Sequence, residues 1–437
     1  MYIPGSRPRL RHRRQLLTVL LVVVTSLIIL SLGTTQVALG AKVKLTWLST
    51  MWKINDQFHR DMVAEFNAMQ DEIEVELETI ASNSQQAEAV LLRVAAGTPP
   101  DIVDFHPNYF YNIAKEGILL NLSPVLAQDP DFNLNDFYKP VLDSLTVDGK
   151  LYGISQRISY YNLYYNADFF SAAGLPFPAV NWFDPNWTWE TYRQAAGKLS
   201  RDTNGDGVFD VVGSVFGTAT GQIVSWLAQG GARLFDDNYT ELTLDTPAGI
   251  NTLRYLSDLI TSGVSRTGSW NDFVAGKAAM LHETPAVAQL IRDANFSYAW
   301  DVAAFPQGPA GPATALQPVP HAIVASSNHL EEAVVFFKYF FSREMSMRQS
   351  AAGITVQPRR SVVTSSSFRT QLGVKNADAI LQALDVAVPI PSHNRNFVAI
   401  NSAITSMLGK VFKGEVAPHL AVEGIKSQVA ALLAEGK

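Results

Sequence analysis

The feature that most constrains the fold is an alternation of extended and helical patterns near the start of the chain. Polar and apolar residues alternate in the extended stretches, whereas apolar residues recur at helical spacing in the stretches between them. The expected elements are a strand at 42–49, a helix at 54–69, a strand at 74–80, a helix at 87–96 and a strand at 101–105. This order requires right-handed crossovers and a parallel sheet, whose ligands bind outside the carboxyl ends of the strands.

Three residues follow those strand ends and are the first candidates for ligand contact. Trp52 lies just past the first strand, and Asp104 and His106 lie at the end of the third. Trp52 could instead cover the core of a lobe, and Asp104 could instead cap the helix that follows. The place of Asp104 at the sheet edge favours ligand contact, whereas the two interpretations of Trp52 are equally supported.

The first forty residues carry the pattern of an export signal. Arginines between residues 7 and 14 precede an uninterrupted apolar stretch at 16–32, and the small residues Ala38 and Gly40 then precede a cleavage point. We therefore expect a signal peptide at 1–40 and an exported protein, in the periplasm or at the outer face of the cytoplasmic membrane. Because the apolar stretch is nearly long enough to cross a bilayer, an uncleaved anchor is the alternative.

Composition excludes several classes of function. The chain has 437 residues, enough for two or three domains. It has 34 Lys and Arg against 40 Asp and Glu, so it lacks the basic surface that nucleic-acid binding requires, and we expect no nucleic-acid partner. It contains no cysteine, which excludes thiolate catalysis, cysteine-bound metals and the lipid-modified cysteine of bacterial lipoproteins.

Segments spread along the chain resemble, in the same order, segments of the extracellular solute-binding proteins of ABC transporters. They lie at 96–103, 148–154, 163–176, 273–280 and 332–359, and include AGTPPDIV, DGKLYGI and FVAGKAAM. The similarity is to the family 1 carbohydrate binders, which are maltose-binding-protein-like, and it covers nearly the whole mature chain.

The resemblance implies an α/β, two-lobed periplasmic-binding-protein fold (type II-like), in which each lobe is a mostly parallel sheet flanked by helices and a hinge joins the lobes. It implies a first lobe at 41–160 and 319–357 and a second at 161–318 and 358–437. It also implies the extracytoplasmic substrate-binding component of an ABC importer. Such a protein captures a sugar or oligosaccharide by hinge closure and delivers it to the permease, as a monomer, with no catalysis and no cofactor.

Further site candidates come from the crossing between the lobes and from the resemblance. A sugar cleft needs aromatic rings beside carboxylates, amides and arginines, because sugars have apolar ring faces edged by hydroxyls. Tyr160 and Tyr161 face opposite sides of an extended crossing, so at most one of them can contact a ligand, and Tyr160 is our candidate. The resemblance adds Trp226, Glu283, Arg395 and Phe397, the last at the place of a stacking tryptophan.

The sequence departs from the family pattern at several site positions. A second stacking tryptophan of the family corresponds to Ala286 here, and Trp226 lies in a helical pattern where an aromatic residue usually packs in the core. The positions that would bind maltose carry Met51, Trp52, Asn108, Tyr109 and Ser159. Maltose specificity therefore does not carry over, and we expect a different saccharide or a glycosylated metabolite.

The loop at 202–210 resembles the first nine positions of an EF-hand calcium loop. Oxygen ligands fall at its odd-numbered positions, supplied by Asp202, Asn204, Asp206, the Val208 carbonyl and Asp210. The twelfth position, which should hold a bidentate glutamate, is Gly213. Two hypotheses follow: a structural calcium site, or a plain turn that joins a helix to a strand.

Two other functions are weighed against transport. A glycan-active exported hydrolase would need two carboxyls roughly 5–10 Å apart, and Asp104 and Glu283 are the pair that could face each other across a cleft. The sequence has no serine-protease-like elbow, HExxH motif or phosphate-binding glycine loop. The remaining alternative is a surface protein that binds carbohydrate or is structural, without a part in transport.

Overall fold

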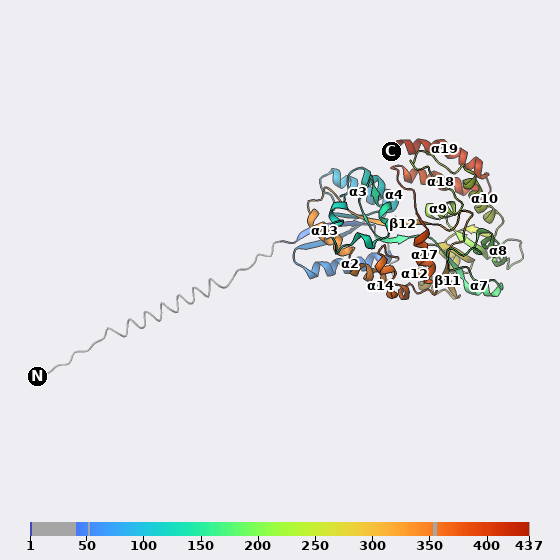
Figure 1. The fold of residues 1–437 in the computed structure, drawn as a ribbon, viewed down its shortest axis with the longest axis horizontal. Coiled ribbons are helices and arrows are strands. Elements are labelled where there is room, and N and C mark those ends of the chain that lie inside the picture. The colour runs from blue at the N-terminus through green and yellow to red at the C-terminus, as the bar shows by residue number, and fades with distance from the viewer. Residues whose placement is uncertain (2–40, 51–52, 353–355, 437) are drawn as a thin grey trace.

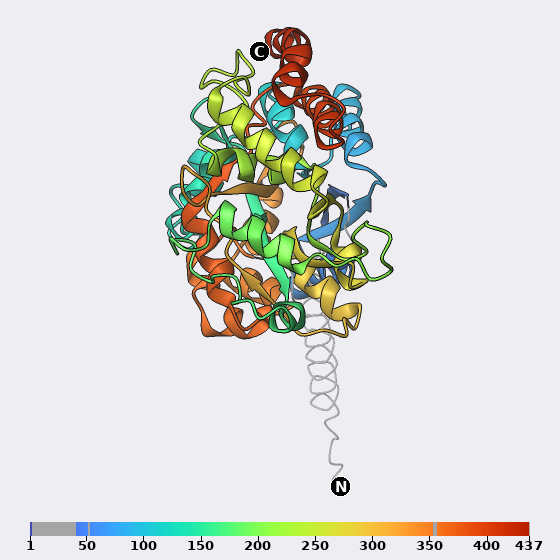
Figure 2. The same ribbon diagram turned by 90° about the vertical axis from the view of Figure 1, so that its right-hand side faces the viewer.

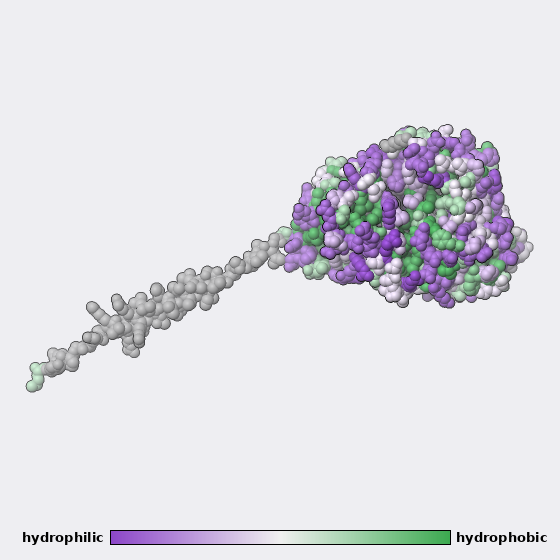
Figure 3. All heavy atoms as spheres, viewed as in Figure 1, coloured by the Kyte–Doolittle hydropathy of each residue, from purple (hydrophilic) through white to green (hydrophobic). Residues whose placement is uncertain are grey.

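The computed structural model describes residue 1 and residues 41–50, 53–352 and 356–436. The expected export signal and the candidate Trp52 lie outside the described residues. The described chain folds into two lobes, each with its own sheet and hydrophobic core (Figure 1). Within these ranges no helix is both long enough and apolar enough to cross a membrane. The face drawn in Figure 3 is largely hydrophilic, with apolar side chains gathered toward its middle.

The first lobe contains the alternation that the sequence predicts. Its elements are β1 (Val43–Ser49), α2 (Lys53–Met69), β2 (Ile73–Thr79), α3 (Asn83–Ala95) and β3 (Ile102–Asp104). The strand β1 lies between β2 and β3 and pairs in parallel with both. Leu45 and Val75 are neighbours in register and are both buried, so the alternating pattern follows from burial of one face of each strand.

Strands from much later in the chain complete the first sheet. The strand β12 (Thr314–Ile323) pairs antiparallel with β3 and with β6 (Ile154–Ser159), and β13 (Ala387–Pro389) joins β12 in parallel. The strand order is β13-β12-β3-β1-β2, with β6 beside β12. A short hairpin, β4 (Thr146–Val147) and β5 (Lys150–Leu151), precedes β6.

The second lobe is built on a sheet of order β11-β7-β10-β8-β9. Its strands are β7 (Asn162–Asn166), β8 (Val212–Phe216), β9 (Ser265–Thr267), β10 (Ala278–Glu283) and β11 (Trp300–Ala303). The strand β8 is parallel to β9 and β10, whereas β7, which enters directly from the first lobe, is antiparallel to β10 and β11.

Helices flank both sheets. Those of the first lobe include α4 (Pro107–Lys115), α5 (Ser123–Leu126), the 3₁₀ helix at Leu134–Asp136, α6 (Lys139–Ser144), α13 (Leu330–Phe340) and α14 (Arg343–Ala351). Those of the second include α7 (Ala167–Ala172), α8 (Trp189–Leu199), α9 (Thr220–Gln229), α10 (Pro247–Thr261), α11 (Trp270–Val274), α12 (Val287–Asp293), α18 (Phe397–Phe412) and α19 (Pro418–Glu435). In both ribbon views α18 and α19 lie at the top of the second lobe, packed on α10 (Figures 1 and 2).

Two segments cross between the lobes, the link from β6 to β7 and the start of β12, and hydrogen bonds join them. The Tyr161 amide donates to Thr314 Oγ1 at 2.8 Å, and this hydroxyl donates to the Tyr161 carbonyl at 2.9 Å. A third connection runs through α15 (Arg360–Val363), α16 (Ser366–Leu372), α17 (Ala377–Gln382) and the 3₁₀ helix at Ala383–Val386. It docks on the same crossing, because the Tyr160 hydroxyl donates to the Ile380 carbonyl at 2.7 Å.

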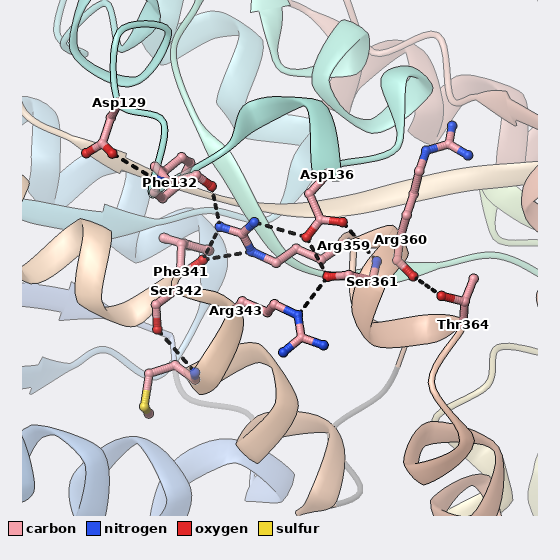
Figure 4. A network of polar contacts seen from close by, with 11 residues as sticks. Asp129, Phe132, Asp136, Phe341, Ser342, Arg343, Arg359, Arg360, Ser361 and Thr364 are labelled. Atoms are coloured by element: carbon pink, nitrogen blue, oxygen red, sulfur yellow. Dashed lines mark hydrogen bonds and ion pairs between the residues drawn. The ribbon is translucent and has the colours of Figure 1, made fainter.

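Arg359 fixes the start of the third connection to the first lobe (Figure 4). Its side chain is almost fully buried; Nη2 donates to the carbonyls of Phe132 and Phe341 at 2.9 and 2.8 Å. Nη1 forms an ion pair with Asp136 at 3.2 Å. Burial favours a higher Asp136 pKa, but hydrogen bonds from Ser361 and Arg359 outweigh it and hold the pKa below its usual value.

Two backbone hydrogen bonds show where the third connection leaves the first lobe. The Ile158 amide donates to the Val356 carbonyl at 2.9 Å, and the Tyr138 amide donates to the Pro358 carbonyl at 3.0 Å. Two stretches that the resemblance assigns to the second lobe, 358–359 and 387–389, therefore contact strands or loops of the first.

Candidate ligand-binding site

A cavity of about 280 Å³, here named the hinge cavity, lies between the lobes at the carboxyl ends of β1 and β3. The first lobe, including β6 and β12, here named the hinge strands, supplies Thr50, Asp104, Phe105, His106, Pro107, Arg157, Ser159, Gln317 and Val319. The second lobe supplies Thr284, Ala286 and Leu290. The cavity thus lies at the sheet edge where parallel strands present ligands, and both lobes bound it.

Asp104 lies in the wall of the hinge cavity and is held by several donors. Its side chain is 6% exposed, and Oδ1 accepts a hydrogen bond from Trp47 Nε1 at 3.1 Å. The Ser49 side chain and the Thr50 amide also donate to this carboxyl. Burial raises the Asp104 pKa to about 6, although these donors and the nearby Arg157 guanidinium act in the opposite direction. Asp104 is therefore a fixed carboxyl that ionises only near pH 6.

His106 caps α4, the role that the sequence offered as an alternative for Asp104. Its Nδ1 accepts a hydrogen bond from the Asn108 amide at 3.3 Å. Burial lowers the His106 pKa to about 4, so the ring is neutral at pH 7. Because Nδ1 accepts, the proton lies on Nε2, which is 3.4 Å from the side-chain amide of Gln317. His106 and Gln317 together form a neutral polar strip along the first-lobe wall.

The second-lobe wall of the hinge cavity is small and largely apolar. Glu283 ends β10, and its Oε1 accepts a hydrogen bond from the Thr284 amide at 2.8 Å. Burial raises the Glu283 pKa. Thr284 itself lines the cavity, and Ala286 lies where the family pattern would have a tryptophan. Glu283 thus adjoins the cavity and is engaged by its own neighbour.

Three sequence candidates do not line the hinge cavity in this structure, because their side chains have no exposed surface. Trp226 stacks on His282 with ring centroids 4.8 Å apart and packs on Phe305 at 4.7 Å. Phe397 is enclosed in the second-lobe core at the first position of α18, and Tyr160 turns toward α17. In each case an aromatic side chain gains more from burial in the core than a surface position would give it.

Arg395 does not line the hinge cavity. Its guanidinium forms an ion pair with Glu116, just past the end of α4, with Nη1 and Oε1 2.9 Å apart. This pair joins the second lobe to the first outside the cavity.

The sequence model of the family described as bacterial extracellular solute-binding protein matches residues 53–347, well over half of the chain. The chain belongs to this family. The match begins at α2 and runs through both hinge strands and the second-lobe sheet. It therefore includes every described residue of the hinge cavity except Thr50.

Several individual solute-binding proteins are similar to this one. The arabinooligosaccharide-binding protein of Bacillus subtilis is 27% identical over 218 residues, which are 48% of this chain and 47% of that protein. The chain thus aligns with about half the length of this curated relative. An ABC substrate-binding protein of Listeria monocytogenes in complex with cycloalternan superposes with a TM-score of 0.77 at 23% identity, over 90% of this chain and 99% of the other. The cyclic α-maltosyl-1,6-maltose binding protein of Arthrobacter globiformis gives 0.77 at 21%, over 90% and 100%.

Sequence reasoning placed Ser159 of this solute-binding protein at a family ligand position, but it did not select Arg157 and chose Tyr160 from the crossing. Arg157 and Ser159 of β6 line the hinge cavity, and Tyr160 does not. Alternation along the strand would have found them, since residues 157 and 159 share one face of an extended chain and Ile158 takes the other. We chose Tyr160 because an aromatic ring suits sugar stacking. That choice did not follow the strand alternation, which brings residues 157 and 159 to the cavity.

The loop at 202–210 satisfies its carboxylates internally. Asp202 accepts hydrogen bonds from the Gly205 and Gly207 amides at 2.7 and 2.8 Å, and Asp210 accepts one from the Thr203 amide at 2.7 Å. A side chain at Gly213 would overlap the Ala196 carbonyl on α8, which excludes a glutamate at the twelfth position. No three His, Cys, Asp or Glu side chains are grouped to hold a metal in the part of the chain that the structure describes. Calcium binding through Asp202, Asn204, Asp206, Val208 and Asp210 stays a prediction.

Proposed function

We propose that this protein is the extracytoplasmic substrate-binding component of an ABC importer and that it captures a sugar or oligosaccharide in the hinge cavity. The observation that carries the proposal is a cavity walled by both lobes, with polar side chains on the hinge strands and at the sheet edge. A ligand that contacts both walls stabilises the closed arrangement of the lobes, and a membrane permease can then recognise closure.

The wall chemistry favours a neutral ligand with many hydroxyls. His106 is uncharged at pH 7, and the carboxyl of Asp104 lies in the field of the Arg157 guanidinium, so neither wall carries a strong excess of one charge. Ala286 and Leu290 offer aliphatic surface for the face of a sugar ring. The volume of about 280 Å³ is near the lower end of the range of ~300–1,000 Å³ for ligand pockets, which favours a short saccharide at this lobe separation.

We further propose binding without catalysis. Glycoside hydrolysis needs two carboxyls that flank the scissile bond. Asp104 is engaged by Trp47, Ser49 and Thr50, and Glu283 is engaged by Thr284 behind the cavity wall. The protein would act as a monomer in the periplasm or at the outer face of the cytoplasmic membrane, with permease subunits and no nucleic acid as partners.

Calorimetric titration of the exported chain with arabino-oligosaccharides, maltodextrins and common monosaccharides tests the proposal. We expect saturable binding of at least one saccharide, a smaller radius of gyration in solution scattering, and no release of reducing ends. The Gln317→Ala variant should bind at least tenfold more weakly, whereas Gln289→Ala, on α12 but outside the lining of the hinge cavity, should bind normally. Reducing-end release would favour the hydrolase, and no binding to any saccharide would favour the structural surface protein.

A further inference from the structure

A second cavity, of about 460 Å³, lies between the lobes away from the hinge cavity. Each lobe lines it with aromatic and polar side chains, chiefly Tyr111, Lys115 and Asp148 from the first and Asn238, Tyr239 and His393 from the second. None of these residues lines the hinge cavity, and the proposed transport function does not use them.

The hinge strand β12 separates the two cavities. Val319 lines the hinge cavity, and Leu316 and Pro318 line a narrow pocket that shares Tyr111 with the second cavity. Gln317 lies between them and lines both the hinge cavity and the narrow pocket. Alternate residues of a strand face opposite sides, so the two cavities lie on opposite faces of β12. The connecting pocket has a volume of about 20 Å³, room for about one water molecule. A saccharide in one cavity therefore cannot extend into the other.

A strained loop holds the Tyr239 ring in the wall of the second cavity. Tyr239 has φ of 53°, a left-handed conformation that is unfavourable for a bulky residue. The carboxylate of Asp236 maintains the loop by accepting from the amides of Thr240 and Glu241 at 2.6 and 2.8 Å. The Tyr239 hydroxyl then lies 3.1 Å from His393 Nδ1, and the His393 ring meets Tyr111 of the other lobe edge-on at 5.3 Å. Strain of this kind persists where surrounding structure enforces it, commonly at ligand sites.

The walls of the second cavity carry little net charge. Lys115 Nζ pairs with Asp148 Oδ2 at 3.0 Å, and burial lowers the His393 pKa, which keeps this ring neutral at pH 7. Aromatic rings beside amides, hydroxyls and a paired lysine suit a ligand that has apolar faces and neutral hydroxyls. A charged ligand would instead compete with Lys115 or Asp148 for its partner.

We propose that the second cavity is a binding site for a neutral saccharide, separate from the hinge cavity and coupled to it through β12. A rotation of the lobes that narrows one cavity widens the other, because the two lie on opposite faces of the same hinge strand. A saccharide that bridges Tyr111 and Tyr239 therefore changes the affinity of the hinge cavity, and the effect is reciprocal. Only this coupling rests on the proposed function; the site itself does not.

Hydrogen exchange of the full chain with maltotriose or arabinotriose at millimolar concentration tests the proposal. We expect slower exchange at 236–241 and 391–396 in the native protein and in a variant with Asp104→Ala and His106→Ala in the hinge cavity. Tyr239→Gly, which keeps the left-handed backbone accessible and removes the ring, should abolish this protection. Tyr111→Ala on the opposite wall should do the same without touching the strained loop.

The outcomes separate the two sites. Protection confined to 103–108 and 283–287 would overturn the second site and leave the proposed function intact. Protection at 236–241 that survives Tyr239→Gly and Tyr111→Ala, or no protection there with either probe, would also overturn the second site. Protection at 236–241 alone would uphold the second site and count against capture in the hinge cavity.

Discussion

Arg395 of the second lobe and Glu116 of the first form an ion pair whose nitrogen and oxygen lie 2.9 Å apart. Both side chains keep more than a third of their surface exposed, so the pair contributes at most ~1 kcal/mol to stability. The family resemblance suggested Arg395 as a ligand contact, whereas this geometry makes it a bridge between lobes. The two roles give different results on mutation.

We expect Arg395→Gln to weaken saccharide binding by no more than about fivefold, because a change of 1 kcal/mol alters an equilibrium by roughly that factor. Glu116→Gln should have the same effect, and the double variant should add nothing further. Calorimetric titration of the three variants measures this. A loss of affinity above a hundredfold in Arg395→Gln alone would return Arg395 to the ligand site.

Asp104 should make the protein less stable as the pH rises from about 4 to about 6. Its pKa is raised from 3.8 to about 6 in the folded chain, so the folded state binds the proton more tightly than the unfolded state in this range. The shift of about two units corresponds to ~3 kcal/mol at most, which is lost as the pH rises through the folded-state pKa of about 6 and stays constant well above it. In Asp104→Asn this slope should disappear.

Urea unfolding of the native and Asp104→Asn proteins at several pH values provides the measurement. Asp143→Asn, an exposed carboxyl on α6, is the matched control and should keep the native pH dependence. Parallel pH profiles for the native and Asp104→Asn proteins would contradict the assignment.

Arg359→Met should reduce the unfolding free energy by about 3–5 kcal/mol, because it leaves the Asp136 carboxylate and two carbonyls without their buried donor. Arg360→Ala is the control. Arg360 is exposed and lies 4.3 Å over the Tyr138 ring, an interaction worth about 0.5–1 kcal/mol. Equal losses of unfolding free energy in the two variants would show that the buried hydrogen bonds of Arg359 stabilise the fold no more than the exposed contact of Arg360.

Gly213→Ala should destabilise the second lobe by about 3 kcal/mol, since the added methyl group overlaps the Ala196 carbonyl. Gly197→Ala, at an exposed position of α8, has its nearest neighbour at 4.0 Å and should raise stability by ~0.5–1 kcal/mol. Thermal unfolding of both variants tests this. A neutral Gly213→Ala would mean that α8 moves away from β8 at little cost.

Calcium should raise the unfolding midpoint if the loop at 202–210 binds it. The ion would compete with amide donors for Asp202 and Asp210, and the loop lacks the twelfth-position glutamate, so we expect weak binding, in the millimolar range. Asp206→Ala should remove the effect. Identical midpoints in chelator and in excess calcium, with no heat of binding, would leave a plain hydrogen-bonded turn.

The sequence predicts the local elements of the first lobe well, because β2 and the first half of β1 bury alternate residues, and α2 repeats its apolar residues every third or fourth position. The position of Asp104 and His106 in the hinge cavity follows from the same strand order. These features depend on short stretches of chain whose pattern is set by burial of one face.

The rest of the site depends on register and on distant contacts. Trp226 and Phe397 carry the residue types that suit sugar stacking, yet α9 and α18 turn them into the core. Gln317 lines the hinge cavity only because β12 pairs with both β3 and β6, a contact between residues more than 150 positions apart. No pattern within a short window carries that information.

The place of β12 in the first sheet has a kinetic consequence. The strands β1 to β3 lie within the first 104 residues, but their sheet is extended by β12 at Thr314–Ile323, and helix α13 beyond it packs on β1 and β12. A chain that emerges from its amino terminus cannot finish the first lobe until every strand of the second-lobe sheet has followed. Closing such long loops slows folding, so the first lobe should stay uncompleted while the chain is still emerging.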